Sequence, residues 1–492
     1  MTFPQLGCYD RFALDTETTG LRYKVDTVFG FSISLPDGQD FYWDIREQTS
    51  ALQWLTGQLA FYRGNVIFAN ASFDIRMLAH MGCVVPMHLA HDVIIRASLI
   101  DEHLNSYSLD NLAKKYLKKE KESTIYAALA GQFGGLATRN VQMKNLHRAP
   151  SNIVAPYAEI DTRLTLELWD WQEEEIKRQE LQQIINFERE LMPTFIRAEM
   201  RGIRADLNYA EEAADKLTPI IEEKQAELNM LAGKEINVNS SPQVKEMFEP
   251  RQLEDGSWVA SNGTKIGTTP KGGPSLGAEY LRGMSDPRAA AILEIRSIIK
   301  TRDTFLRGHV LAHSVGDRVY PAINQAQGET GGTGTGRLSY QNPAMQQIPS
   351  RNKSVAALVK PCFLPDEGMK WVDIDESSFE VRIFAHLVNN PEIIAAYKEN
   401  PGLDLHQFVA DITGLVRNAT YSGQPNAKQL NLSMIFNSGN GAIADKMGMP
   451  WEWNSFKDNT GKLITYKKAG SEALDVIDSY HRRLPGVKNL AE

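Results

Sequence analysis

WVDIDESSFEVRIFAH, residues 371–386, changes its hydrophobic period halfway along. Its first residues, Trp371 to Ile374, favour a buried β-strand, and Asp373 and Asp375 would share one face of that strand. From Phe379 onward, apolar residues recur at intervals of three and four, which predicts a helix just past the acids. Burying two carboxylates at such a turn costs free energy unless a cation is bound there. The alternative is that an aspartate only caps the helix.

The composition is that of an ordinary globular protein. At 42% hydrophobic and 23% charged residues, the 492-residue chain is long enough for roughly three domains. Its three cysteines are too scattered for a disulfide framework or a metal site, which favours a reducing compartment (Cys8, Cys83 and Cys362). No run of about 18 apolar residues could span a bilayer, and Asp10 and Arg11 stand where a signal peptide would be apolar. We therefore expect a cytoplasmic protein without a membrane partner.

Four acids in the first third of the chain follow apolar segments in the pattern of a divalent-metal site. Asp15 and Glu17 follow one apolar run and share a face of the expected strand. Asp74 ends a second apolar run, and Asp161 lies one helical turn after Tyr157. Four carboxylates from separate segments suit two divalent cations about 4 Å apart, which clamp a phosphate and activate water. Tyr157 would orient that water.

Three motifs in this region resemble a known family. LDTETTG (residues 14–20), NASFD (70–74) and YAEID (157–161) match, in order and spacing, the proofreading 3′-to-5′ exonuclease domain of DNA polymerases, in the DEDD group with tyrosine in its third motif. The resemblance covers residues 1–185 and implies an α/β, ribonuclease H-like fold. It implies a site with two Mg²⁺ or Mn²⁺ ions, a water-positioning Tyr157, and four metal ligands: Asp15, Glu17, Asp74 and Asp161.

Charge patterning is a weak guide to nucleic-acid binding in this chain. A net charge of −8 argues against nonspecific adhesion to nucleic acid, yet it leaves room for a local basic groove. The run KKYLKKEK, residues 114–121, is typical of a solvated helix face. It would also suit phosphate contact beside a nuclease cleft, and both interpretations stay open.

The middle of the chain is predicted to be mainly helical. Apolar periodicity from Leu166 to Leu231 predicts a long helix, a turn at residues 201–206 and a second long helix. Ser241 and Pro242 then start a further short helix. Gly, Ser, Thr and Pro clusters in residues 251–275 predict a mobile loop. This order resembles the thumb subdomain of the DNA polymerase I family (family A), which we assign to residues 186–320.

A Gly- and Thr-rich segment follows, residues 325–339, and then NPAMQQIP at residues 342–349. Together they resemble the family A segment that contacts the primer-template. Glycines let the backbone approach phosphates. The resemblance implies that Arg337, Gln346 and Gln347 bond to acceptors in the minor groove, where readout tests base-pair shape without selecting sequence.

DESSFEVRIFAH, residues 375–386, resembles motif A of the same family, DYSQIELRVLAH. The resemblance implies that Asp375 binds both catalytic metals and that Glu380 closes the pocket against a ribose 2′-hydroxyl. Glu376 replaces the family's tyrosine, and Asp373 has no assured role. His406 lies in a segment that matches the family's short D-x-H sequence, so it is expected to contact phosphate; the alternative is a capping or core role.

Lys428, Leu432 and Phe436 fall at i, i+4 and i+8 and form one stripe on a predicted helix. A core stripe is the simpler interpretation, but lysine is a poor core residue and a good anchor for a triphosphate. The stripe resembles motif B, which implies that Lys428 binds nucleotide phosphates while Leu432 and Phe436 face sugar and base. The chain departs from the family where Gln424 replaces arginine, Leu432 an aromatic residue and Phe436 tyrosine.

Motif C of the family, a His-Asp-Glu hairpin of the palm, is not found after Phe436. Residues 478–487 instead resemble the helical end of the fingers. We therefore expect an incomplete right-hand polymerase, with a palm at residues 321–388, helical fingers at 389–492, and no C-terminal palm. Two further metal ions would bind the polymerase site only if the palm were completed. No 5′-nuclease domain leads the chain, an arrangement that resembles bacteriophage polymerases, which act in the host cytoplasm.

Two functions compete. The favoured one is the N-terminal portion of a family A DNA polymerase with a proofreading exonuclease, acting on primer-template, single-stranded DNA and deoxynucleoside triphosphates, with a second chain supplying the C-terminal palm. The alternative is a stand-alone metal-dependent 3′-5′ exonuclease with a vestigial DNA-holding polymerase part. A DNA-binding module with dead sites is disfavoured, because all four nuclease acids are present.

Overall fold

The computed structural model divides the chain into two compact units, Met1–Lys370 and Trp371–Glu492. It describes residues 3–120, 124–254, 256–269, 272–328, 331–350, 352–420, 424–457, 463–484 and 486–491. The boundary between the units falls inside the range 321–388. No helix in these described ranges is long and apolar enough to cross a membrane.

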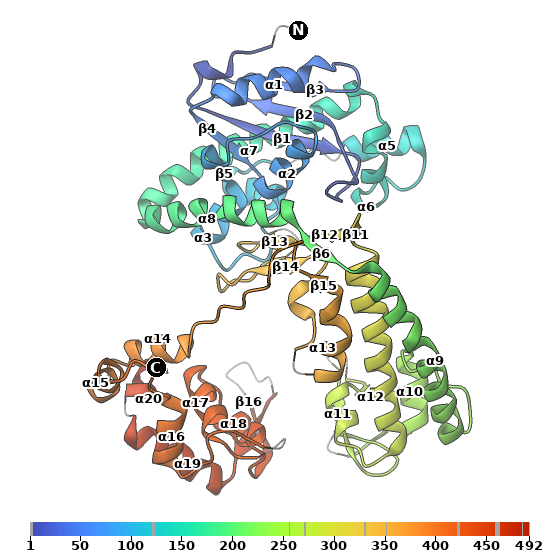
Figure 1. The fold of residues 1–492 in the computed structure, drawn as a ribbon, viewed down its shortest axis with the longest axis vertical. Helices are drawn as coiled ribbons and strands as arrows, with labels where there is room; N and C mark the ends of the chain where they lie inside the picture. Colours follow the sequence, from blue (N-terminus) through green and yellow to red (C-terminus); the bar gives the residue numbers. More distant parts are fainter. Residues whose placement is uncertain are drawn as a thin grey trace. The chain divides into compact units, whose positions relative to one another are not determined.

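A five-stranded sheet in the order β3-β2-β1-β4-β5 forms the first part of unit 1 (Figure 1). β1 pairs antiparallel with β2 and parallel with β4. Apolar residues at even positions of β1 pack against α1, and the odd positions face α7, because successive strand residues point to opposite faces. The strands are β1 (Arg11–Thr18), β2 (Val28–Ser34), β3 (Asp40–Asp44), β4 (Asn65–Phe68) and β5 (Ala90–Asp92).

Helices cover both faces of this sheet, which gives the mixed α/β fold that the sequence predicted. They are α1 (Ser50–Phe61), α2 (Ala71–His80), α3 (Val93–Ile100), α4 (Leu109–Leu112), α5 (Thr124–Phe133), α6 (Arg139–Gln142) and α7 (Ser151–Gln179). Shorter turns are η1 (Leu6–Cys8), η2 (Met87–Leu89), η3 (Ala113–Leu117) and η4 (Met143–Arg148).

The second predicted long helix is present, but the first is divided at Glu180, which has a φ of 59°, and the turn at residues 201–206 contains a strand. α8 (Gln182–Arg201) ends at Gly202, and β6 (Ile203–Ala205) precedes α9 (Leu207–Ala232). Gly202 has a φ of 64°, and a Cβ there would lie 2.6 Å from the ring of Tyr320. Only glycine therefore fits this turn. β6 is one of the two inner strands of a sheet in the order β11 (Ser314–Val315), β12 (Arg318–Val319), β6 and β15 (Phe363–Leu364).

The prediction of a mobile loop at residues 251–275 is wrong. Short strands here form an antiparallel sheet in the order β10-β9-β8-β7, and Ala260 and Ile266 join a core with Phe248 and Ile292. The glycines are tight-turn residues between these strands, since Gly256 and Gly263 have positive φ. Residues 255, 270 and 271 lie outside the described residues. The strands are β7 (Arg251–Gln252), β8 (Trp258–Val259), β9 (Lys265–Thr268) and β10 (Pro274–Ser275).

The remaining elements of unit 1 pack on α9 or follow it. The helices are α10 (Ser241–Phe248), α11 (Ala278–Arg282), α12 (Pro287–Ile299), η5 (Lys300–Leu311), η6 (Met345–Gln347), α13 (Lys353–Val359) and η7 (Lys360–Cys362). The strands are β11 (Ser314–Val315), β12 (Arg318–Val319), β13 (Ala322–Asn324), β14 (Ser339–Gln341) and β15 (Phe363–Leu364).

Unit 2 is a helical cluster with one β-hairpin, which the sequence had not predicted. Its core joins Leu405, Leu430, Ile443 and Tyr480. The helices are α14 (Phe379–Val388), α15 (Pro391–Glu399), α16 (Leu405–Thr413), α17 (Ala427–Ile435), α18 (Asn440–Lys446), α19 (Ser471–Arg483) and α20 (Gly486–Ala491). The hairpin consists of β16 (Trp451–Lys457) and β17 (Leu463–Ala469).

The predicted buried strand at residues 371–375 is absent, although the helix after it is present as α14. These residues are irregular, and Val372 and Ile374 are 76% and 87% exposed. Within the described ranges no strand pairs with them. A strand is stable only when a neighbouring strand takes up its backbone hydrogen bonds. Residues 371–375 favour a strand locally, but no described strand lies beside them.

A buried ion pair joins the first part of unit 1 to the part that follows it. Glu199 of α8 accepts from Ser72 of α2 and from the backbone N–H of Ile323 in β13, and it lies 3.3 Å from Arg76 Nε. Arg76 and Glu199 are both buried. The pair therefore ties α2 to β13.

We predict that Glu199→Ala lowers the free energy of unfolding of unit 1 by about 3–5 kcal/mol, because it leaves the buried charge of Arg76 unpaired. Urea unfolding followed by circular dichroism measures this change. Glu190→Ala, on the exposed face of the same helix, is the matched control and should shift stability by less than about 0.5 kcal/mol. Equal shifts for the two variants would refute the importance of the ion pair.

Candidate active sites

β1 presents Asp15 and Glu17 on the face that α7 covers. Asp15 lies opposite Ser32 of β2, and Glu17 lies opposite Gly30, just before a bulge at Thr18. A bulge re-aims the side chains beside it. The Ser32 hydroxyl donates to the Ala158 carbonyl at 2.9 Å, which fixes α7 against this face. Glu17 is buried and Asp15 is half-buried.

Asp74 reaches the same region from the first turn of α2. Asn70 adopts the left-handed conformation, with a φ of 81°, where the chain turns from β4 into this helix. The Asp74 carboxylate then accepts from the backbone N–H of Thr16 at 3.1 Å and from its hydroxyl at 2.6 Å. Asp74 is therefore fixed directly beside the acids of β1.

Asp92, which the sequence reading missed, holds the loop that precedes Asp74. Its carboxylate accepts from the backbone N–H groups of Asn70 at 3.3 Å and Ala71 at 2.8 Å. It also caps α3 by accepting from Ile94 N–H at 2.8 Å. An aspartate just before an apolar helical run is a common N-cap signal, so the capping role could have been predicted from the sequence. The contact with residues 70 and 71 could not, because those residues are distant in the sequence.

α7 brings Tyr157 and Asp161 to the β1 acids. Burial raises the pKa of Tyr157 well above its usual value, and the negative charges of Asp161 and Glu17 raise it further. Asp161 is buried one turn along the same helix. The charges that act on Tyr157 come from both α7 and β1, so these two elements meet at Tyr157.

The electrostatics of this site suit a divalent cation. Burial raises the pKa of Asp74 well above its usual value, and the negative charge of Asp15 raises it further. Carboxylates that repel one another in a poorly solvated place are stabilised by a hard cation such as Mg²⁺ or Mn²⁺. Within the described ranges, however, no three His, Cys, Asp or Glu side chains are arranged so that they could hold one metal ion as they stand.

The lysine run at residues 114–121 is mostly ion-paired. Lys114 lies 2.7 Å from Glu120, and Lys115 lies 2.8 Å from Asp101. Lys119 makes a third pair, at 2.6 Å, with an acid of α7. Lys121 is outside the described residues. These pairs favour the interpretation of a solvated surface over that of a phosphate contact.

Unit 2 places the lysine stripe on one solvent-facing side of α17. Lys428 is exposed, Leu432 is half-buried, and Phe436, the residue that ends the helix, is 60% exposed. A core stripe would be buried along its whole length. The stripe is therefore available to a ligand.

His406 lies beside this stripe at the start of α16. Burial lowers the pKa of His406, and the positive charge of Lys428 is among the further causes. Asn431 donates to His406 Nδ1 at 3.1 Å and accepts from the Tyr480 hydroxyl at 2.9 Å. Because Nδ1 accepts, the neutral imidazole carries its proton on Nε2 and can donate it to an anion. Asn431 and Tyr480 were not identified from the sequence, because their contact spans 49 positions.

The motif A residues lie in a different environment. Asp375 and Glu380 are both exposed, Asp375 in the irregular segment and Glu380 in the first turn of α14. Nothing in unit 2 encloses Asp375 among the described residues in the way that α7 encloses Asp15. The structure therefore brings together the acids of unit 1, but it does not enclose Asp375 in a comparable site.

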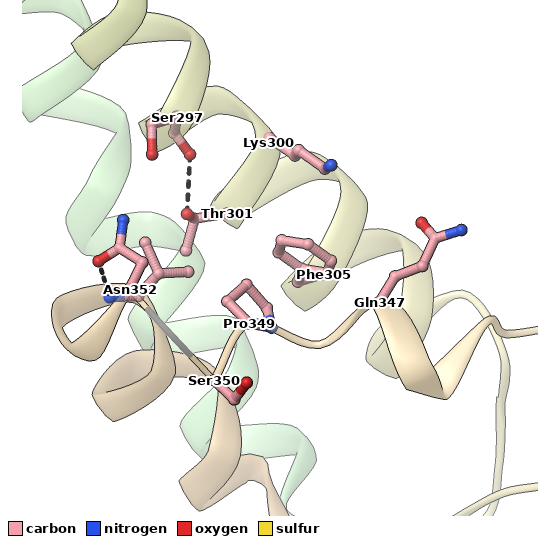
Figure 2. Close-up of a pocket in the computed structure, with 9 residues that line it drawn as sticks. Ser297, Lys300, Thr301, Phe305, Gln347, Pro349, Ser350 and Asn352 are labelled. Carbon is pink, nitrogen blue, oxygen red and sulfur yellow. Dashed lines mark hydrogen bonds between the residues drawn. The ribbon is translucent and has the colours of Figure 1, made fainter. Parts of the chain in front are cut away.

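The three predicted DNA contacts all lie in unit 1 and are exposed. The Gln346 amide donates to the Leu338 carbonyl at 2.7 Å and accepts from Tyr340 N–H at 3.3 Å, so it stabilises the β14 segment. Gln347 lines a pocket of about 340 Å³ between η5 and the segment before α13. Figure 2 shows Lys300 and Gln347 among the residues that line this pocket.

The comparisons with known proteins agree with this architecture. Residues 207–492 match the family described as DNA polymerase family A, and residues 3–177 match the family described as 3′-5′ exonuclease. The chain therefore belongs to DNA polymerase family A and has an exonuclease domain before its polymerase part.

Its relatives include phage enzymes named DNA polymerase DpoZ. The one from Vibrio phage phiVC8 is 56% identical over 504 residues, which cover 100% of this chain and 80% of that protein. The one from Salmonella phage PMBT28 is 50% identical and is covered to 79%. The solved POL domain of Pol1 from M. smegmatis, in complex with DNA primer-template and dNTP, has a TM-score of 0.69 at 19% identity, over 98% of this chain and 75% of that one. At that identity the likeness shows a shared fold.

We predict that Asn431→Ala destabilises unit 2 by about 1–3 kcal/mol, because it leaves the buried Tyr480 hydroxyl and His406 Nδ1 without partners. Thermal unfolding of the full chain measures the loss. Asn440→Ala, at an exposed position of α18, is the matched control. If both variants unfold at the wild-type temperature, the network contributes no stability.

Proposed function

We propose that this chain is a divalent-metal-dependent 3′-to-5′ exonuclease joined to the DNA-holding and nucleotide-binding part of a family A polymerase. The supporting observation is that the charge of Asp15 acts on buried Asp74, while the charges of Asp161 and Glu17 act on buried Tyr157, so acids of β1, α2 and α7 lie near one another. A structural role alone does not explain this arrangement, since like charges held together without a cation are destabilising.

In this proposal the four acids hold two Mg²⁺ or Mn²⁺ ions, which when bound would position the scissile phosphate and lower the pKa of the attacking water. Tyr157 stays protonated because its pKa is raised, so its hydroxyl donates a hydrogen bond to that water and orients it. Thr16 fixes the Asp74 carboxylate before the DNA arrives. The metal ligands in this proposal are Asp15, Glu17, Asp74 and Asp161.

The polymerase part would bind an incoming nucleotide along the exposed side of α17. Lys428 pairs with the phosphates, and the Nε2–H of His406 donates to them. Leu432 and Phe436 then present an apolar surface to the sugar and base. Glu380 would exclude a ribose 2′-hydroxyl at the same pocket.

Duplex DNA would lie against the segment that holds Arg337 and Gln347. Arg337 is exposed at the end of the Gly-rich segment, where it can reach a phosphate or a minor-groove acceptor. Lys300 lines the same pocket as Gln347, so it adds a positive charge for the DNA backbone (Figure 2). Gln346 would act on DNA mainly by holding the β14 segment in place.

DNA synthesis would require further palm strands at the surface around Asp375. Trp371, Val372 and Ile374 are exposed, and so are the apolar residues at i, i+4 and i+8 of α14, which are Phe379, Ile383 and Leu387. Adjacent exposed apolar side chains of this kind mark an interaction surface. We propose that palm strands from outside residues 1–492 pair here and complete a site for two metal ions at Asp375.

Asp15→Ala should lower the rate of 3′-end degradation by about 10³-fold, since it removes a ligand that the metal-assisted step needs. The assay follows a labelled single-stranded DNA with Mg²⁺, and EDTA should stop the wild-type reaction. The melting temperature should not fall, because the variant relieves repulsion with Asp74. Asp10→Ala, an exposed acid beside the same strand, should degrade DNA normally; full activity of Asp15→Ala would contradict the assignment.

With Mg²⁺, primer-template and all four nucleotides, the chain alone should degrade the primer without extending it. Adding a second polypeptide should restore extension, if it contains the part of the Vibrio phage relative that this chain does not cover. Lys428→Ala should then abolish extension and leave degradation intact. Extension by the chain alone would refute the need for a partner, and no extension with the second chain would favour the alternative, a stand-alone exonuclease whose polymerase part only holds DNA.

A further inference from the structure

Tyr42 occupies an unusual place on the face of the sheet that carries the acids of β1. It lies on β3 opposite Ser32 of β2, which in turn lies opposite Asp15. The next row on the same face runs from Asp44 through Gly30 to Glu17. Tyr42 is therefore one row away from Glu17 on this face of the sheet.

The missing side chain of Gly30 creates the space that the Tyr42 ring fills. A Cβ at Gly30 would lie 2.7 Å from the Cε2 and Cζ atoms of Tyr42 and closer still to its hydroxyl oxygen. The phenol thus lies over the glycine, between Asp44 on one side and Glu17 on the other. In agreement, burial raises the pKa of Tyr42 and the negative charges of Asp44 and Glu17 raise it further.

The Tyr42 hydroxyl is buried and, among the described residues, makes no hydrogen bond. Buried hydroxyl groups in proteins nearly always have a partner. Asp44 is held by Arg46, whose Nε donates to Oδ1 at 2.8 Å and whose Nη2 donates to Oδ2. Glu17 lies across Gly30 in the same row and its charge acts on Tyr42, so its carboxylate can accept from the phenol.

We propose that Tyr42 is a positioning residue of the exonuclease site, whose hydroxyl donates a hydrogen bond to the Glu17 carboxylate when Glu17 binds a divalent cation. One carboxylate oxygen would be fixed by Tyr42 and the other would face the cation. Glutamate has a long side chain that loses rotamer freedom on binding, and a fixed donor reduces that loss. This inference rests on the proposed exonuclease function.

Tyr42→Phe keeps the ring over Gly30 and removes only the hydroxyl. Partners of this kind behind a metal ligand change metal affinity by about 10- to 100-fold. We expect the variant to bind Mn²⁺, measured calorimetrically on the full chain without DNA, about tenfold more weakly. The Mn²⁺ concentration for half-maximal degradation should rise by the same factor, while the rate at saturating Mn²⁺ stays within about twofold of wild type, because Tyr42 does not touch the reacting atoms.

Tyr62→Phe is the matched control, since Tyr62 is an equally buried tyrosine of the same domain whose hydroxyl bonds to backbone carbonyls away from the acids. It should leave Mn²⁺ binding unchanged. Gly30→Ala, which displaces the Tyr42 ring, should reproduce the Tyr42→Phe shift, with circular dichroism verifying the fold of each variant.

The outcomes separate the inference from the function on which it rests. Wild-type Mn²⁺ affinity in a folded Tyr42→Phe overturns the positioning role, as does an equal loss in Tyr62→Phe, which would indicate general destabilisation. If the wild-type chain neither binds Mn²⁺ nor degrades DNA, the proposed exonuclease function fails and the role of Tyr42 fails with it. A shift in Tyr42→Phe alone supports the inference.

Discussion

Repulsion between buried carboxylates is the constraint that the first unit has to satisfy. Asp15 and Asp74 lie close enough that the charge of one raises the pKa of the other, so the free energy of holding them together must come from the surrounding frame. That frame consists of the Thr16 hydrogen bonds to Asp74 and the Ser32 hydrogen bond to α7. Because these bonds join β1, β2, α2 and α7, the position of each element depends on the others, and the acids keep their places before any cation or DNA arrives.

Unit 2 also holds a buried ionisable group, His406, and keeps it in place with neutral hydrogen-bond partners. His406 is buried near Lys428, and Asn431 and Tyr480 fix its proton on the nitrogen that faces away from them. A neutral donor beside an exposed lysine suits an anion without adding another buried charge. The acids of unit 1 and the residues around His406 thus depend on different chemistry, the first on charge and the second on oriented hydrogen bonds.

Sequence reading succeeded where function and fold depend on local pattern. The spacing of Tyr157 and Asp161 placed both on one helix, the apolar run before Asp15 placed it on a strand, and the i, i+4, i+8 stripe from Lys428 matched α17. The α/β fold and the polymerase family followed from these motifs and agree with the comparisons. The role of each site residue remains a prediction.

Prediction from the sequence failed where contacts between distant segments decide the local structure. Val372 and Ile374 favour a strand locally, yet no described strand pairs with them. The Gly- and Ser-rich residues 251–275 look mobile in isolation, but they form hairpins, and Ala260 and Ile266 join a shared core. Asp92 and Tyr42 gain their importance from contacts with other segments. The Glu199 contacts with α2 and β13 have a consequence for recombination: exchanging only residues 1–185 would take Arg76 and Glu199 from different parents, so the two residues keep a common origin only when the crossover falls beyond Glu199.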